Sequence, residues 1–335
     1  MSGTFGDISD RNGIKVSQRL LSDAKENLVL SRWSKQEDIP QNQGKTINWR
    51  RYSNLDFAMD PIVGNNTPDG IELPFVDITS TIQQFGSWVP VDQVIRDTHE
   101  DPILKVATEK LAFQMAKTLE KLCFNVVVGG AQVVFTNGSV RTSVNTVVNL
   151  KHFRAAVRKL RASDAMEITS LVRSTPDYDT HGIEPAFFAH ASTVLEPAFR
   201  AMNGFLPISE YPAGVQRVKG EIGTVEATRI VLSNISEPFV GGGAVGGTNV
   251  IENPGDSKAN VYPIIIFAQE AFGSTKLAGM DAGAVKVVNP KPTQGDELGQ
   301  RGSAGWLTWY ASAILNDDFM VRIETAAPTD AGISN

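Results

Sequence analysis

The segment GKTINWRRYSNLDFAMDPIVGNNTPDG, residues 44–70, decides the fold because it predicts a structure that cannot stand alone. Alternate side chains of an extended chain point to opposite faces, so Trp49 and Arg51 share one face and Arg50 lies on the other. Turn-forming residues follow, and a second alternating run covers 71–88. The pattern predicts a long hairpin within 45–95. A two-stranded hairpin is only marginally stable in water, so something outside it must hold it.

The composition is that of a globular protein without a general affinity for nucleic acid. The chain has 335 residues, of which 41% are hydrophobic and 20% charged, close to average values. Its net charge of −6 argues against a protein that must neutralise phosphates. Neither a membrane-spanning stretch nor a signal peptide is recognisable, so we expect a soluble protein with no membrane partner. Cys123 is the single cysteine; it excludes an internal disulfide framework and fits a buried core thiol.

The strongest secondary-structure signal lies in THEDPILKVATEKLAFQMAKTLEKLCFNVVVGG, residues 98–130. Asp101 suits a helix N-cap and Pro102 the first helical position, while Gly129 and Gly130 end the pattern. Apolar residues recur mostly at spacings of three, four and seven, which is one helical stripe: Leu104, Leu111, Met115, Leu119, Leu122 and Val126. The predicted helix is more than twice the mean length of about 11–12 residues, which is typical of a structural beam.

The remaining segments predict short strands and helices without regular βαβ alternation, which indicates an α+β fold. We expect a buried strand over 184–192, a hairpin over 220–234, a central strand from 261, a polar linker over 289–305 and a strand around 319–323.

Residues 150–166 predict an amphipathic helix with a basic stripe of Lys151, Arg154, Arg158 and Arg161. The stripe is either a solvated face that pairs with acidic neighbours, such as those of 167–184, or a contact with nucleic acid or another subunit.

No catalytic, cofactor or metal site emerges from the sequence. GGGAVGG, residues 241–247, matches Gly-x-Gly-x-x-Gly, but a dinucleotide site needs a helix to follow, so we predict a flexible surface loop. The four histidines lack metal-ligand spacing. His190, inside an apolar strand, is interpreted as a buried, hydrogen-bonded histidine. We therefore expect no enzyme and no cofactor.

A thin arm, a hairpin without its own core and a beam-like helix together indicate a subunit that assembles with neighbours. Arg50 and Arg51 project to opposite faces, so one could meet its own subunit and the other a neighbour. Glu100 and Asp101 are candidate partners, because an arginine–carboxylate pair provides registry as well as energy. The predicted subunit-contact residues are Trp49, Arg50, Arg51, Glu100, Asp101, Arg154 and Arg158.

Five stretches, in this order over about residues 20–325, resemble the major capsid proteins of tailed bacteriophages, which have the HK97-like fold: GKTINWRRY, EDPILKVATEKLAFQMAKTLEKL, KGEIGTVEATRIVLSN, YPIIIFAQEAFG and WLTWYASAILNDDFMVRIE. Within that group the chain looks most similar to the family typified by the major head protein of coliphage N4.

The resemblance implies five segments: an N-terminal arm (1–44), an E-loop hairpin (45–95), a peripheral domain with the spine helix (96–150), an axial domain (151–289) and a C-terminal return to the peripheral domain (290–335). It implies a subunit that forms hexamers and pentamers of an icosahedral shell around double-stranded DNA, without sequence-specific binding, in a virion assembled in the host bacterial cytoplasm. The short arm favours a separate scaffolding protein; a portal and a decoration protein are further expected partners. The alternatives are an encapsulin-like nanocompartment shell and an enzyme or ligand-binding protein with an unrecognised site.

Overall fold

The computed structural model describes residues 29–55, 57–59, 70–92, 103–130, 132–172, 180–212, 217–218, 220–247, 249–278, 285–288, 292 and 297–329. The predicted cap residues Asp101 and Pro102, the contact candidate Glu100 and most of the predicted N-terminal arm lie outside these ranges.

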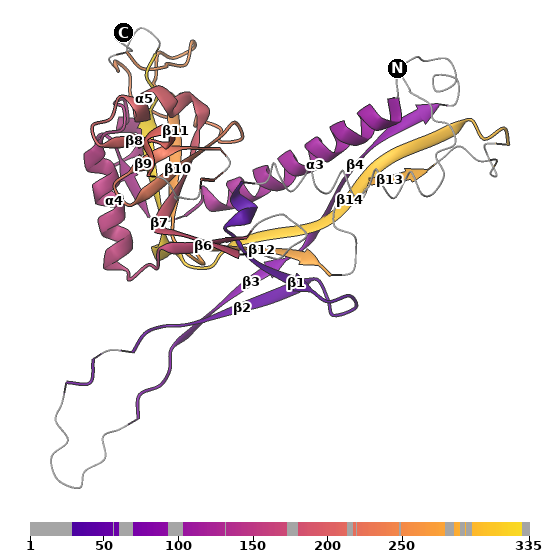
Figure 1. Cartoon of the computed structure of the whole chain (residues 1–335), viewed down its shortest axis with the longest axis horizontal. Helices are drawn as coiled ribbons and strands as arrows, with labels where there is room; N and C mark the ends of the chain where they lie inside the picture. The colour runs from indigo at the N-terminus through magenta and orange to yellow at the C-terminus, as the bar shows by residue number, and fades with distance from the viewer. Residues whose placement is uncertain are drawn as a thin grey trace.

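One long helix, α3 (Ile103–Val127), links the two halves of the subunit (Figure 1). It confirms the predicted beam, and Gly129 and Gly130 follow its end as expected. Its buried face carries Leu111, Met115, Leu119, Cys123 and Val127, whereas two members of the predicted stripe, Leu122 and Val126, are only half-buried. No helix in the described ranges, α3 included, is apolar and long enough to cross a bilayer.

The first sheet lies against α3 and has the order β1-β12-β14-β13, with β4 on the other edge of β14. Its strands are β1 (Lys35–Ile39), β4 (Gln83–Asp92), β12 (Phe272–Leu277), β13 (Val285–Val288) and β14 (Arg301–Ile314). Alternate residues of β14, among them Ala304, Trp306 and Tyr310, are buried with the apolar face of α3 in one core. The helix therefore covers one face of this sheet.

The predicted polar linker over 289–305 is wrong in its last residues, because β14 already begins at Arg301. Small residues conceal the strand in the sequence. A side chain at Gly305 would come within 2.8 Å of the Trp88 Cβ, so glycine permits the close pairing of β14 with β4.

The second sheet forms the compact lobe of Figure 1 and has the order β5-β15-β11-β7-β10-β9-β8, with β6 on β7. Its strands are β5 (Val133–Phe135), β6 (Ile168–Val172), β7 (Thr180–Ser192), β8 (Phe205–Pro207), β9 (Glu221–Val225), β10 (Thr228–Ser233), β11 (Val261–Phe267) and β15 (Met320–Ala326). β11 is buried along its whole length between β15 and β7, which confirms the predicted central strand. The predicted β9–β10 hairpin is also confirmed.

Helices cover both faces of this second sheet. α4 (Leu150–Ala162) and α5 (Glu196–Arg200) pack on one face, and α3 on the other. α4 is the predicted amphipathic helix, and a capping box between Asn149 and His152 fixes its start. Short 3-10 turns complete the fold: η1 (Leu30–Arg32), η2 (Arg141–Ser143), η3 (Thr193–Leu195), η4 (Ile208–Glu210) and η5 (Asp317–Phe319).

The predicted hairpin consists of β2 (Thr46–Tyr52) and β3 (Phe75–Thr81), an antiparallel pair that projects away from both sheets (Figure 1). β4 follows directly but pairs with β14, so it anchors the hairpin to the first sheet. The five predicted segment boundaries remain predictions, since strands from several segments meet in each sheet.

Candidate functional site

The base of the hairpin is held by Trp49, whose side chain is buried. Trp49 faces Ile78 across the pair, and its indole lies so close to Gly273 of β12 that a Cβ there would approach it to 3.3 Å. The alternation of burial along β2 matches the predicted faces. This predicted contact residue thus fixes the hairpin to its own subunit.

Arg50 forms a bidentate pair with Asp77 directly opposite on β3, with Nε–Oδ1 at 2.7 Å and Nη2–Oδ2 at 2.9 Å. The hydrogen bonds to Arg50 lower the pKa of Asp77 and raise that of Arg50. The guanidinium also lies 4.4 Å from the centre of the Phe75 ring. The described partner of Arg50 is therefore Asp77 of the same hairpin; Glu100 and Asp101, its predicted partners, lie outside the described residues.

Arg51 lies on the other face of the strand and is half-exposed. Its Nε atom is shielded from water, and within the described ranges it has no hydrogen-bond partner. The predicted contact of Arg51 with a neighbouring chain stays a prediction.

Beyond its base, the hairpin exposes large apolar side chains. Phe57 is 92% exposed and Met59 84%. They belong to a larger set that we call the hairpin end: Leu55, Phe57, Met59, Ile71 and Leu73. Large apolar side chains exposed in this number favour an interaction surface, since single exposed ones need no explanation.

The face of the first sheet opposite α3 is a second apolar surface, which we call the outer sheet face. Trp88, Gly305 and Lys286 lie in one row across β4, β14 and β13, and the Trp88 side chain is 67% exposed. Further along β14, the Lys45 ammonium lies 5.5 Å from the centre of the Trp309 ring. Aromatic rings and lysines therefore share this face.

The basic stripe of α4 is partly neutralised within the subunit. Arg154 binds Glu226 (2.7 Å), and Arg161 binds Glu167 (3.2 Å). Glu167 belongs to the predicted acidic segment 167–184, whereas Glu226 does not. Arg158 is exposed and forms no ion pair with the described residues. Exposed pairs contribute only about 0–1 kcal/mol, so the stripe has little role in stability.

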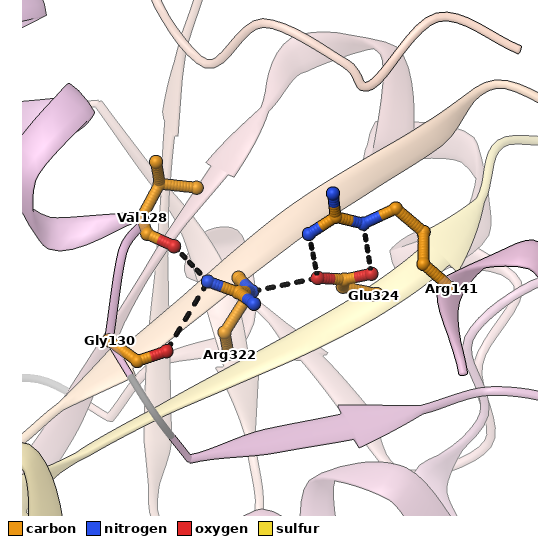
Figure 2. Close-up of polar contacts among 5 residues, drawn as sticks. All are labelled: Val128, Gly130, Arg141, Arg322 and Glu324. Atoms are coloured by element: carbon orange, nitrogen blue, oxygen red, sulfur yellow. Dashed lines mark hydrogen bonds and ion pairs between the residues drawn. The ribbon is translucent and has the colours of Figure 1, made fainter. Parts of the chain in front are cut away.

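A triad of charged side chains around the buried Glu324, which we call the helix joint, connects the end of α3 to the second sheet (Figure 2). Glu324 on β15 is fully buried and accepts two hydrogen bonds from Arg141, both of 2.7 Å, and one from Arg322, of 2.8 Å. Arg322 also donates to the carbonyls of Val128 and Gly130. Because the last carbonyls of a helix lack partners within it, Arg322 stabilises the end of α3 and fixes it to β15.

The glycine-rich loop is partly exposed, as predicted for a surface loop, with Val245 59% exposed, but its buried Gly243 packs beside this joint. Arg141 lies 3.6 Å from the centre of the Phe239 ring, at the start of the loop. The Gly243 amide donates to the Ala259 carbonyl at 3.0 Å, and a Cβ at Gly243 would lie 2.2 Å from the Val144 carbonyl oxygen. Glycine is thus needed at 243 for close packing.

A second buried carboxylate, Glu120 of α3, lies beneath residues 29–34, which we call the arm root. Glu120 is 1% exposed and accepts the backbone N–H groups of Val29 (3.1 Å) and Leu30 (2.9 Å). Its Oε1 lies 3.9 Å from Nε2 of His190. His190 is buried as predicted, but neither ring nitrogen has a hydrogen-bond partner among the described residues, so the predicted hydrogen bonding is wrong.

Sequence reasoning missed both buried carboxylates, Glu120 and Glu324. No arrangement of metal-binding side chains, with three or more His, Cys, Asp or Glu together, occurs in the described ranges. The prominent features of the subunit are surfaces and joints.

Solved structures with the same architecture are capsid subunits. The chain aligns with the capsid of Ralstonia phage GP4 at a TM-score of 0.63 and 13% identity, covering 92% of this chain and 91% of that one. For the head structure of Helicobacter pylori bacteriophage KHP40 the TM-score is 0.60 at 9% identity, with 90% and 89% covered. For the cyanophage P-SCSP1u capsid it is 0.57 at 12% identity, with 90% and 88% covered. The fold is thus the HK97-like fold of phage capsid subunits, as predicted.

The sequence itself matches the family model for phage capsid proteins over residues 76–323, and the chain belongs to this family. It is also 25% identical over 173 residues to the major capsid protein of Pseudomonas phage KPP21; that match covers 48% of this chain and 43% of the relative. The family confirms the prediction of a structural protein rather than an enzyme. The finer resemblance to N4-type head proteins stays a prediction.

Proposed function

We propose that the chain is the subunit that assembles, as hexamers and pentamers, into the icosahedral shell of a tailed bacteriophage and encloses its double-stranded DNA. Membership of the phage capsid family supports a viral shell over a cargo compartment. The observation that carries the proposal is the hairpin, which projects from the body (Figure 1), together with the exposure of Phe57 and Met59 beyond its strands.

The expected partners follow from this role. Further copies of the chain are the first, and a separate scaffolding protein, a portal and a decoration protein are the others, with assembly in the host bacterial cytoplasm. The packaged DNA is held without sequence-specific binding. The net charge of −6 supports a wall that does not adhere to the duplex, since like charges repel until salt screens them.

We infer that the hairpin end of one copy docks on the outer sheet face of another. Both surfaces are apolar, and their charges are complementary: the segment 53–74 has no basic residue but contains Asp56, Asp60, Asp69 and Glu72, whereas the outer sheet face carries Lys45 and Lys286. Opposite charges at the edge of an apolar contact set orientation and exclude wrong partners. A head-to-tail contact of this kind forms a ring when the rotation between neighbouring copies closes.

Replacing Phe57 and Met59 together by Asp is expected to abolish shells while leaving the subunit folded, because both side chains are exposed in the subunit and buried only in the assembly. Negative-stain microscopy should show no shells, and circular dichroism should be unchanged. The control, Phe57→Leu with Met59→Leu, keeps the apolar character and should assemble. Abundant shells from the Asp variant would rule out the hairpin end as a contact.

Charge reversal tests the docking face separately. Lys286→Glu should slow assembly, most clearly at low salt, because it places a negative charge where the acidic hairpin end docks. Combining it with Glu72→Lys should restore part of the rate, as measured by light scattering. The matched control is Lys110→Glu on the exposed side of α3, where no effect is expected. If the Lys286 and Lys110 variants behave alike, the hairpin end docks elsewhere.

A further inference from the structure

The capping box that fixes the first turn of α4 contains a histidine. The side chain of Asn149 accepts the amides of Leu150 (2.6 Å) and His152, and Nδ1 of His152 accepts the amide of Asn149 at 3.0 Å. In a capping box this second acceptor is normally Glu or Gln, and both of these keep their acceptor atoms around neutral pH. Histidine at this position makes the cap depend on the charge of an imidazole.

The hydrogen bond itself determines which charge state closes the cap. A ring nitrogen accepts a hydrogen bond only while it carries no proton, and both nitrogens of a protonated imidazole are donors. Protonation of His152 therefore sets a donor against the Asn149 N–H and breaks this half of the cap. His152 is only 8% exposed, so the new charge is also costly to keep buried. The cap is closed with a neutral imidazole and opens in acid.

Few charges face this imidazole from the elements packed around it. Among the described residues, the Lys151 ammonium is the charge that acts on the ring. The β15 residues that pack toward α4, Val321 and Ile323, are uncharged. Other charged residues near α4 are bound elsewhere: Arg322 and Arg141 to Glu324, Arg154 to Glu226, and Arg200 to Glu196.

The carboxylates of η5, Asp317 and Asp318, lie toward the opposite end of α4. Asp318 there accepts a hydrogen bond from Gln132, and Lys159, two turns after His152, donates to the carbonyl of Val133. The acidic side chains of this face of the sheet thus do not offer His152 a partner that would hold a proton on the ring.

Burial and the Lys151 ammonium lower the pKa of His152 below its ordinary 6.5, against smaller opposing effects of the backbone at Thr136 and Asn149. Above about pH 6.5 the imidazole is neutral whether the turn is closed or open, so the cap contributes fully. As the pH falls below 6.5, a hydrated imidazole in the open turn takes up the proton first. The open form therefore gains until the pH passes the lowered pKa of the closed form.

We propose that His152 makes the first turn of α4 a pH-operated clasp, which is closed at neutral pH and opens when the imidazole is protonated in weakly acid solution. The chain is firmly held on both sides of this turn. Before it, the Thr146 carbonyl accepts the Thr136 hydroxyl (2.9 Å) and the Ala326 amide (3.1 Å). After it, Phe153 is fully buried in the core of the second sheet.

Opening is therefore confined to residues 147–152, and it frees Lys151, the first residue of the basic stripe, from its fixed position. The clasp belongs to the single subunit and does not depend on the docking proposed for the hairpin end.

Amide hydrogen exchange of the unassembled full chain at pH 7.5 and pH 5.0, corrected for intrinsic rates, tests the clasp. For the peptide containing residues 147–153, the opening equilibrium should increase about three- to thirtyfold at pH 5.0, because one proton changes an equilibrium by at most tenfold per pH unit. The end of the same helix, residues 158–162, serves as the internal reference and should not change.

His152→Gln is the matched variant, because glutamine accepts the same amide in an ordinary capping box and does not titrate. Its first turn should be protected equally at both pH values. In His152→Ala the acceptor is missing, so the turn should exchange fast at both.

Equal protection of the wild-type turn at pH 7.5 and pH 5.0 overturns the proposal, whatever the variants do. A pH response that persists in folded His152→Gln also overturns it, because another group would then control the turn. The same holds if the turn stays protected in His152→Ala, since the imidazole would then not be what closes it.

Discussion

Replacing Glu324 by Ala is expected to destabilise the subunit by about 3–5 kcal/mol, the cost of removing one partner from a buried ion pair. Arg322 would remain in the interior with its charge uncompensated, and Arg141 would lose both of its hydrogen bonds. The total stability of a domain is about 5–15 kcal/mol, so the substitution should remove a large part of it while leaving a folded fraction that can be measured. Urea unfolding of the unassembled subunit measures the change.

Glu196→Ala is the matched control, because Glu196 also pairs with an arginine, Arg200, but at the surface. The expected loss of unfolding free energy in Glu196→Ala is below about 1 kcal/mol. A stronger comparison replaces the whole joint by Met at 141 and 322 and Leu at 324. That variant should be more stable than Glu324→Ala, since no charge is left unpaired, although the end of α3 loses its cap. Equal stability of Glu324→Ala and wild type would show that the joint is not stabilising.

Leu111→Asp is expected to prevent folding altogether. Leu111 lies in the core between α3 and the first sheet, where a carboxylate finds neither water nor a described cation. An unpaired charge in a core costs more than about 4 kcal/mol, at the far end of the range for single substitutions. Soluble yield at 37 °C and circular dichroism should both show the loss.

Phe113→Asp is the control on the same helix, two residues further along. Phe113 is nearly half exposed, with the Lys117 ammonium 4.4 Å from its ring centre. The new carboxylate would be hydrated and close to a cation, so a soluble, folded subunit is expected. Soluble Leu111→Asp with native circular dichroism would mean that this face of α3 is not buried.

The sequence patterns predicted those helices and strands whose determining residues lie close together in the chain. The apolar residues of α3 are spaced so that those on adjacent turns share one face, and the glycines after them end the helix. The alternation around Trp49 requires only that the chain is extended. β11 was recognisable because a strand covered on both faces is apolar throughout. In each of these elements, the residues that determine the structure lie within the element itself.

The buried carboxylates had no such signal. Glu120 stands between Leu119 and Lys121, where a charged residue suggests the solvent side of a helix. What buries it is the arm root, some 90 positions earlier in the chain. Glu324 alternates with Val321 and Ile323, which suggested a strand with one polar face. β15 instead lies inside the sheet between β5 and β11, so that polar face is buried too.

The position of β14 and β15 in the chain has a consequence for biosynthesis. These strands are translated after all the other described strands, yet each lies inside its sheet with neighbours on both edges: β14 joins β4, β12 and β13, and β15 joins β5 to β11. A nascent polypeptide therefore contains most of the strands of both sheets before either sheet can be completed. Contacts between such distant segments form slowly, and incomplete chains are prone to aggregate. A chain that ends before Arg301 lacks β14 and therefore the central strand of the outer sheet face. Such a truncated product cannot replace a complete subunit in an assembly that uses this face.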